Sequence, residues 1–407
     1  MDSFRHNVPL LAICQALMMS GTSLIVSTAA LVGYALAEDK SLATLPLAAQ
    51  FLATMFTSIP AAMLMDRIGR KPGFMIATVF GASGGTIATL AIAGGEFWFF
   101  LLGTVLIGVF NGFGTYFRFA AADAVVEEKK SRAISYIMAG GIVAAFVGPN
   151  LANLTRDWLY TAEFAGSYAA VVSFYVLAFL VMAFLKLPHR EDNPEELQYA
   201  MRPLKVIASQ SRFIVALICG MLGYGVMTLV MTATPLAMQH HAHTFANTSF
   251  VIQWHILGMF APSFFTGHLI KRFGESLIMF SGVLLELGCV ITNLLGSSVE
   301  HFWLALFMLG LGWNFLFVGA TSLLTSTYHQ RERAKVQALN DFSVFTTVAV
   351  ASLAAGTLQH LFGWQMVNIG VLPMLAIMLL SLLWLRFKDS PNENTVTDEL
   401  AVQQSVS

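Results

Sequence analysis

The stretch Asp66-Arg67-Ile68-Gly69-Arg70-Lys71-Pro72 is a charged turn between two long apolar segments. The segments before and after it, residues 42–65 and 73–94, are each long enough to cross a bilayer core of about 30 Å, which takes roughly 20 helical residues. Charged side chains are costly inside a bilayer, so a turn with this much charge belongs at a membrane surface. We therefore predict two membrane helices joined by a short polar loop.

The composition of the whole chain agrees with a membrane protein. Of its 407 residues, 57% are hydrophobic and 11% are charged, whereas roughly 25% of the residues of a soluble domain are charged. The net charge of −1 gives no sign of a nucleic-acid partner. The three cysteines, Cys14, Cys219 and Cys289, each lie in an apolar segment and are expected to be buried and unreactive. No cofactor and no bound metal are expected.

Twelve apolar segments follow one another along the chain. Segments this long and continuously apolar are helices, because only helices and closed barrels satisfy the backbone in lipid. We thus predict an all-α membrane protein with twelve transmembrane helices, at residues 8–36, 42–65, 73–94, 98–122, 133–155, 165–187, 211–237, 248–270, 275–296, 301–328, 335–359 and 365–386.

The distribution of Lys and Arg predicts the orientation. All 22 basic residues except Lys40, Arg118 and Arg156 lie at or near helix ends on the side of the Asp66 turn. Because cytoplasmic loops carry the excess of positive charge, this side is predicted to be cytoplasmic, and an even number of helices then places both termini there. We expect an integral protein of a bacterial inner membrane.

An internal repeat divides the chain into two halves. His268-Leu269-Ile270-Lys271-Arg272-Phe273-Gly274 lies between helices eight and nine as the Asp66 turn lies between helices two and three, and aligning Gly69 with Gly274 shifts the sequence by about half its length. The polar, Pro-containing stretch after helix six marks the boundary. The predicted domains are an N-terminal six-helix bundle, a cytoplasmic linker, a C-terminal six-helix bundle and a disordered tail, at residues 1–187, 188–210, 211–387 and 388–407.

The Asp66 turn resembles the signature loop of the major facilitator superfamily of secondary transporters. That family usually carries a glycine four residues before the aspartate, where this sequence has Ala62. The resemblance implies two pseudo-symmetric six-helix bundles that act by alternating access, usually as a monomer. It also implies that Asp66 docks at the start of helix eleven, near Asn340, when the cytoplasmic side is closed.

The same resemblance assigns a gating role to the charges of this motif. A motif arginine, Arg67 or Arg70, would pair with Asp123 at the cytoplasmic end of helix four. A contact that exists in only one conformation biases the equilibrium between conformations. The alternative is that these charges only set topology. The predicted gating residues are Asp66, Arg67, Gly69, Arg70, Lys71 and Asp123.

A stretch of helix five resembles the Gly-Pro motif of drug:proton antiporters in the same family. Gly140-Gly141 is followed by Gly148-Pro149, but Ala152 and Asn153 stand where the motif ends in a glycine pair. This partial match gives a slight lean toward efflux by proton antiport. Close helix packing at small residues with a proline kink explains the same residues without any direction of transport.

Three ionisable residues within the predicted membrane helices are candidates for function. Such residues are costly unless paired, and they are functional hypotheses by default. Arg118 in helix four is predicted either to hold an anionic group in the cavity or to reach the cytoplasmic interface and Asp123. Glu286 in helix nine is a candidate proton carrier, with a hydrogen-bonded structural role as the alternative. His255 in helix eight is a candidate proton site or a structural interhelical histidine.

His240, His241 and His243 form a cluster in the loop after helix seven. Histidine-rich tracts can bind metal, but no acid or thiol accompanies these three. We therefore do not predict a metal site.

In the family, helices one, four, seven and ten line the central cavity. Polar and aromatic residues in these helices are the predicted substrate contacts, although aromatic stripes more often serve packing. An aromatic, amide-rich cavity with one arginine suits a flat or anionic organic molecule of middle size, such as a vitamin, drug or metal chelate. The predicted substrate-binding residues are Gln15, Met18, Asn111, Tyr116, Tyr224, Met227, Trp313, Asn314 and Phe317.

These observations predict a proton-coupled secondary transporter of an organic solute, with a slight lean to efflux. The alternative is an importer of a nutrient such as a flavin-like vitamin or an iron chelate, and a third reading is a membrane receptor or scaffold that does not transport. No Gly-x-x-x-x-Gly-Lys-Ser/Thr loop is present, so ATP is not expected to drive transport. An enzyme is not expected, because acids, histidines and nucleophiles do not gather at one depth.

Overall fold

The computed structural model describes residues 3–126, 133, 136–159, 162–187, 202–329 and 332–389. The described residues are mainly helical, and no strand occurs among them. The N-terminal half contains α1 (Ser3–Leu36), η1 (Lys40–Leu42), α2 (Leu45–Ile68), α3 (Arg70–Gly94), α4 (Phe97–Gly114), α5 (Phe117–Asp123), α7 (Gly140–Thr155) and α8 (Ala165–Ala183). The C-terminal half contains α9 (Leu204–Ala208), α10 (Ser211–His240), α11 (Phe245–Phe260), α12 (Ser263–Phe273), α13 (Glu275–Leu295), α14 (Val299–Thr325), α15 (Arg333–Gly370) and α16 (Leu372–Asp389).

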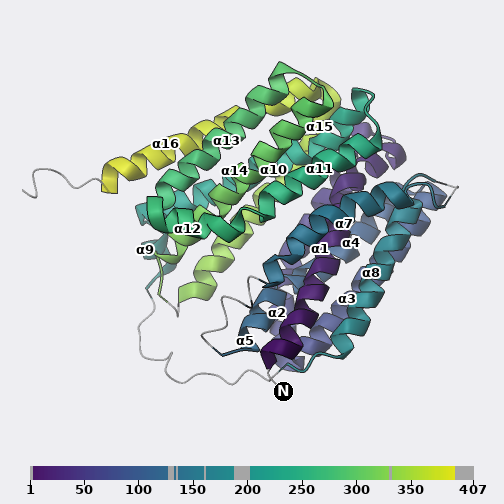
Figure 1. Ribbon diagram of the computed structural model, residues 1–407, viewed down its shortest axis with the longest axis horizontal. Helices are drawn as coiled ribbons and strands as arrows, with labels where there is room; N and C mark the ends of the chain where they lie inside the picture. The colour runs from purple at the N-terminus through teal and green to yellow at the C-terminus, as the bar shows by residue number, and fades with distance from the viewer. Residues whose placement is uncertain are drawn as a thin grey trace, which may run out of the picture.

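The helices account for the twelve predicted spans. Within the described residues, 10 helical stretches are long and apolar enough to cross a membrane. One of them, residues 335–388, is 54 residues long and contains two spans, because Gly363 at φ 77° turns the chain within α15. The eighth predicted span is divided between α11 and α12 and is therefore too short to count as one helix. Twelve spans in two bundles result (Figure 1).

Two of the predicted spans are interrupted. The span predicted at residues 248–270 stops at Phe260 and resumes at Ser263, because Pro262 lacks the N–H that a continuous helix needs. The span predicted at residues 98–122 is likewise divided between α4 and α5. The span predicted at residues 248–270 is thus two helices, whereas residues 97–121 still form one apolar stretch long enough to cross a membrane. Most of the predicted linker, residues 188–201, and the tail beyond residue 389 lie outside the described residues.

The two turns that revealed the internal repeat have the same backbone conformation. Gly69, between α2 and α3, has φ 91° and ψ 156°, and Gly274, between α12 and α13, has φ 82° and ψ 156°. A positive φ of this kind is readily adopted only by glycine. The repeat seen in the sequence is therefore also a repeat of local structure.

The two halves lie side by side and meet along two helix pairs, α2 with α15 and α7 with α11 (Figure 1). Near the start of α2, Thr44 Oγ1 accepts a hydrogen bond from the backbone of Gly356 and donates one to the carbonyl of Leu353. Thr357 Oγ1 donates to the carbonyl of Ser41 beside them. We call this the Thr44 end of the molecule; the opposite end, with the charged turn, is the Asp66 end.

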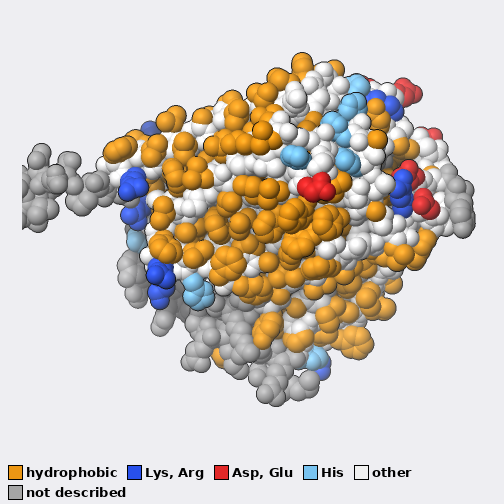
Figure 2. All heavy atoms as spheres, turned by 45° about the horizontal axis from the view of Figure 1, so that its top comes forward, with side chains coloured by type: hydrophobic (Ala, Val, Ile, Leu, Met, Phe, Trp, Pro, Cys, Tyr) orange, Lys and Arg blue, Asp and Glu red, His pale blue; other side chains and the backbone are white. Residues whose placement is uncertain are grey.

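The surface separates into an apolar band and two charged ends. Figure 2 shows hydrophobic side chains covering the middle of the visible face, with Lys and Arg at one end and Asp, Glu, His and basic residues gathered at the other. Large apolar side chains such as Phe56, Leu90 and Phe99 are more than half exposed. A bilayer covers such a band, so the chain is an integral membrane protein.

Candidate functional site

An aromatic cluster in the C-terminal half forms the centre of the candidate site. The rings of Trp313 and Phe317, one turn apart on α14, are stacked with centroids 4.9 Å apart and planes 11° apart. Tyr224 of α10 lies 5.2 Å from Trp313 and 6.0 Å from Phe317. Phe260, the last residue of α11, meets Trp313 edge-on at 6.2 Å. Residues one turn apart share a helix face, so α14 presents a stacked pair toward α10 and α11.

This cluster reaches the N-terminal half through the glycine pair of helix five. A Cβ on Gly141 of α7 would lie 2.6 Å from the ring of Phe260. A Cβ on Gly140 would lie 2.9 Å from the backbone of Ala16 and 3.2 Å from Gln15 Cγ. The absent side chains thus let α7 approach α11 on one side and α1 on the other. Gln15 and the aromatic cluster are thereby brought to the same helix contact region.

The second half of the helix-five motif also packs against α1. A Cβ on Gly148 would lie 2.6 Å from Ser23 Cβ and 2.7 Å from the carbonyl of Ser20. Pro149 follows inside α7, whose regular helix continues to Thr155. Both pairs of small residues therefore allow close helix approach, as the packing interpretation of the motif expects.

Side chains of α1 contact residues of the fourth membrane helix, including the predicted substrate residue Asn111. Met18 lies directly against Gly114, where a Cβ would overlap its sulfur. Asn111 Nδ2 donates to Thr22 Oγ1 over 3.3 Å, whereas the buried Asn111 Oδ1 has no partner among the described residues. Beyond the break in helix four, Tyr116 donates to the carbonyl of Ser58 on α2 at 2.9 Å. Asn111 and Tyr116 thus form hydrogen bonds within the N-terminal half, and only part of their hydrogen-bonding capacity is left for a substrate.

Two predicted substrate residues are buried within the C-terminal half instead. Asn314 Nδ2 donates to the carbonyl of Met259 and to Ser263 Oγ, both at 2.7 Å, and its Oδ1 accepts from Thr266 Oγ1 at 2.7 Å. This amide bridges the break between α11 and α12, so its hydrogen bonds are used structurally. Met227, one turn from Tyr224 along α10, is only 2% exposed and belongs to the same hydrophobic core as Trp313, which is 6% exposed.

The charged turn forms contacts with its own half. Arg70, rather than Arg67, forms an ion pair with Asp123 at 2.5 Å. Lys71 Nζ donates to the carbonyl of Ala183, the last residue of α8, at 2.6 Å. A cation at a helix C-terminus is favourable because unpaired carbonyls concentrate negative charge there. These contacts hold α3 to the ends of α5 and α8.

Asp66 is exposed and makes no hydrogen bond or ion pair with the described residues of α15. Asn340, its expected neighbour, donates to Asp341 instead. Arg118 stacks over the ring of Phe119 with its Cζ 4.8 Å from the centroid, and its charge also acts on Asp341 of the opposite half. At the Asp66 end, the charges of the two halves thus face each other without the docked contact expected for a closed gate.

His255 and Glu286 are both fully buried inside the C-terminal half. His255 Nδ1 is 2.8 Å from the carbonyl of Leu306 on α14, an interhelical contact. Glu286 on α13 has no hydrogen-bond partner for either carboxyl oxygen within the described structure.

Sequence reasoning missed Phe260 and Asp341. Phe260 is one of 33 phenylalanines, so its residue type alone carries no signal, although the proline two residues later marks a helix end. Asp341 lies in a segment that was predicted as a plain membrane helix. Its charge within that segment was the available signal.

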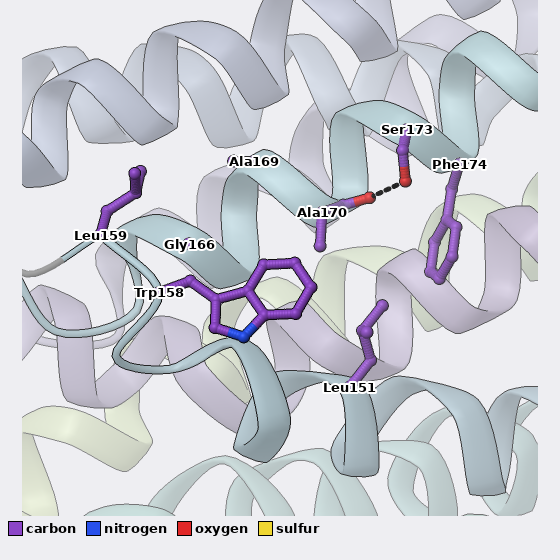
Figure 3. A pocket seen from close by; sticks show the side chains of 8 residues that line it. All are labelled: Leu151, Trp158, Leu159, Gly166, Ala169, Ala170, Ser173 and Phe174. Carbon is purple, nitrogen blue, oxygen red and sulfur yellow. Dashed lines mark hydrogen bonds between the residues drawn. The ribbon is translucent and has the colours of Figure 1, made fainter.

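A surface hollow of about 570 Å³ lies between α7 and α8 (Figure 3). Its walls are Leu151, Trp158, Leu159, Gly166, Ala169, Ala170, Ser173 and Phe174. The hydroxyl of Ser173 donates back to the carbonyl of Ala170, so it offers no free donor. None of these residues belongs to the aromatic cluster.

Across the described ranges, no group of three or more His, Cys, Asp and Glu side chains is arranged to hold a metal ion. His243 Nε2 is 2.7 Å from the carbonyl of Ser297, and His240 and His241 lie edge to face. Burial and the neighbouring histidines lower the pKa of His241 below its usual value.

Two six-helix bundles, an apolar outer band and an aromatic and polar region where the bundles meet define a membrane transporter. The sequence profile of the Major Facilitator Superfamily matches residues 11–251 and 216–406, and the chain belongs to this superfamily.

Relatives and solved structures agree with this assignment. The riboflavin transporter RfnT of Brucella anthropi is 42% identical over 384 residues, which cover 94% of this chain and 96% of that protein. The uncharacterized MFS-type transporter YdeG of Bacillus subtilis is 24% identical over 371 residues, 88% of this chain and 85% of that protein. A partially occluded inward-open structure of the xylose transporter XylE from E. coli superposes with a TM-score of 0.68 at 12% identity, over 95% of this chain and 98% of that one. The last likeness concerns the fold alone.

Proposed function

We propose that this protein transports riboflavin, or a closely related flavin, across a bacterial inner membrane. The observation that carries this proposal is the 42% identity to RfnT over nearly the full length of both chains. The shared identity spans both halves, so it covers every helix that contributes to the candidate site. The proposal selects the flavin-like vitamin from the substrates that the sequence left open.

The aromatic cluster suits the chemistry of a flavin. The isoalloxazine ring system is flat, and such rings stack on aromatic side chains with a specific geometry. The stacked faces of Trp313 and Phe317, bordered by Tyr224 and Phe260, offer such a surface. The buried Nε1 of Trp313 has no partner among the described residues and would donate to a flavin oxygen. Gln15 and Asn111 would contact the ribityl hydroxyls from the other half.

Transport would proceed by alternating access of this site. We place the Asp66 end in the cytoplasm because of the excess of Lys and Arg there. In this conformation Thr44 and Gly356 close the opposite end, while Asp66 is undocked, as expected for an inward-facing state. Rocking of the halves would break the first contact and dock Asp66 near the start of α15, where the helix N-terminus favours a carboxylate.

We further propose that a proton gradient drives a monomer to take up the vitamin. Riboflavin is a nutrient, which favours uptake over the efflux direction that the helix-five motif suggested. Gly148 packs against α1 in a manner that suits either direction.

The test is uptake of labelled riboflavin by bacterial cells that cannot make or import it. Expression of this protein should restore both growth on low riboflavin and uptake of the label. Everted vesicles with an imposed pH gradient then give the direction of movement. Equal uptake in cells with and without the protein, at matched membrane abundance, would refute flavin transport.

Asp66→Asn separates a transporter from a receptor or scaffold. We expect this variant to reach the membrane and bind riboflavin but to lose most uptake, because the docked state lacks its charge. Arg272→Gln, at the matching turn of the other half, is the control for a general loss of surface charge. Full uptake by Asp66→Asn would show that the turn only sets topology.

A further inference from the structure

Glu286 is a buried acid that neither the fold nor the aromatic cluster uses. It lies in the middle of α13 with 0% exposure, and neither Oε1 nor Oε2 has a hydrogen-bond partner in the described part of the chain. Buried carboxyl groups in membrane proteins are nearly always paired. An ionised carboxylate without a partner is strongly disfavoured in such surroundings. In this conformation Glu286 is therefore the neutral acid.

The groups that face Glu286 are weakly polar or apolar. Cys289, three residues further along α13, and Cys219 on α10 are both fully buried. Cys219 in turn lies 3.8 Å from Ser381 Oγ of α16, and α14 presents the bare backbone of Gly312. Among the described residues, no Lys, Arg or His forms an ion pair with Glu286.

We propose that Glu286 is the proton-binding site that couples the pH gradient to flavin transport. This inference rests on the proposed function and names the residue that carries the coupled ion. The step is a simple protonation: the carboxylate accepts a proton from the outer compartment, and its O–H bond breaks to release that proton on the cytoplasmic side. No redox partner and no other covalent change are needed.

The geometry gives Glu286 a short connection to the candidate substrate site. A Cβ on Gly312 of α14 would lie 2.9 Å from Glu286 Cγ and 2.8 Å from the carbonyl of Gly282. The backbones of α13 and α14 therefore approach closely at this point, with the Glu286 side chain beside Gly312. The next residue after Gly312 is Trp313, whose ring forms the aromatic stack. Charging Glu286 would push α13 and α14 apart at the residue that positions this ring.

Sequence offered no such connection. Glu286 lies in helix nine, which is not a cavity-lining helix in this family. The connection depends on Gly282 of α13 and Gly312 of α14, because these glycines let the two backbones approach each other.

The test compares purified wild type with Glu286→Gln, which keeps the shape of the side chain but cannot carry a proton. Proteoliposomes are assayed for riboflavin accumulation driven by a pH gradient and for riboflavin counterflow at equal pH. With one coupled proton, a gradient of about one pH unit supports about tenfold accumulation. We expect Glu286→Gln to lose this accumulation and its pH dependence, while counterflow, which needs no net proton movement, continues.

Two further variants sharpen the result. Glu286→Asp keeps an acid and should restore part of the pH-driven accumulation. Glu275→Gln, on the same helix and hydrogen-bonded to Ser322, should accumulate riboflavin as wild type does. Unchanged accumulation and pH profile in Glu286→Gln would overturn the proposal.

An infrared spectrum keeps the test independent of flavin transport. The neutral acid predicts a carboxyl C=O band in the wild type that Glu286→Gln removes and Glu275→Gln retains. If wild type moves no riboflavin but this band is present, the proposed substrate fails and the protonation of Glu286 stands. If the band is absent, Glu286 is not the proton site, whatever the substrate.

Discussion

The hydroxyl of Thr44 joins the two halves of the molecule: it accepts a hydrogen bond from the backbone N–H of Gly356 at 3.2 Å and donates to the carbonyl of Leu353 at 3.3 Å. Thr44 is fully buried, and a Cβ on Gly356 would lie 2.6 Å from its Oγ1. The contact therefore needs both the hydroxyl and the glycine. Since it joins α15 to the residue before α2, it must break when the halves separate at this end.

Thr44→Val removes both hydrogen bonds and keeps the shape of the side chain. Each lost net hydrogen bond costs about 1 kcal/mol, so loss of both should make the closed Thr44 end roughly fivefold to thirtyfold less favoured. A cysteine at the buried Ser352 would report this as faster labelling by a membrane-impermeant thiol reagent. Thr86→Val, whose hydroxyl donates only within α3, is the matched control. Equal labelling rates in both variants would mean that Thr44 is no gate.

Trp313→Ala tests the aromatic cluster. Aromatic pairs contribute about 0.5–1.5 kcal/mol beyond the area that they bury, so loss of this ring should weaken riboflavin binding at least two- to twelvefold. Quenching of flavin fluorescence by the purified protein measures this affinity directly. Trp98→Ala removes an exposed indole at the start of α4, in the other half of the chain. This variant should bind riboflavin normally. Similar affinity in both variants would place the substrate elsewhere.

The ion pair of Glu332 with Arg202 should make the thermal stability of the protein depend on pH. Arg202 hydrogen-bonds its carboxylate at 2.6 Å and 2.9 Å, which holds the pKa of Glu332 well below its usual value. A depressed pKa stabilises the fold above the unfolded value of about 4.3, and this stabilisation is lost as pH falls below it. Glu332→Gln should thus lower the unfolding temperature at neutral pH.

The difference between Glu332→Gln and wild type should narrow as pH falls below about 4.3. Thermal unfolding in detergent across that range measures it. Glu96→Gln, an exposed residue without a side-chain hydrogen bond at the start of α4, is the control. A difference that stays constant with pH would mean that the ion pair with Arg202 is not its source.

The membrane spans could be predicted from the sequence, because their length and apolar character are properties of contiguous residues. The Asp66 turn and its partner at Gly274 marked the two halves for the same reason. The roles of single side chains were harder to predict, since they depend on which way a helix faces. Asn314 and Asn111 occupy equivalent positions in the two halves of the sequence. In the structure, however, the Asn314 amide hydrogen-bonds to residues on both sides of the helix break at Pro262.

Gly141→Ala tests the contact between the halves at the aromatic cluster. The added methyl would lie 2.6 Å from the ring of Phe260, which packs on Trp313. Overpacking of this kind costs about 1–3 kcal/mol, so either α7 and α11 separate or Phe260 turns away from Trp313. Both responses disturb the candidate site, and we expect weaker riboflavin binding together with slower transport.

Gly267→Ala provides the matched control for this change. It adds the same methyl on α12, where no atom lies within 4 Å, so its stability and transport should equal or exceed those of wild type. Binding is measured by flavin fluorescence and stability by thermal unfolding of the same preparations. If Gly141→Ala loses stability but binds riboflavin normally, then α7 serves packing alone and the substrate does not depend on Phe260.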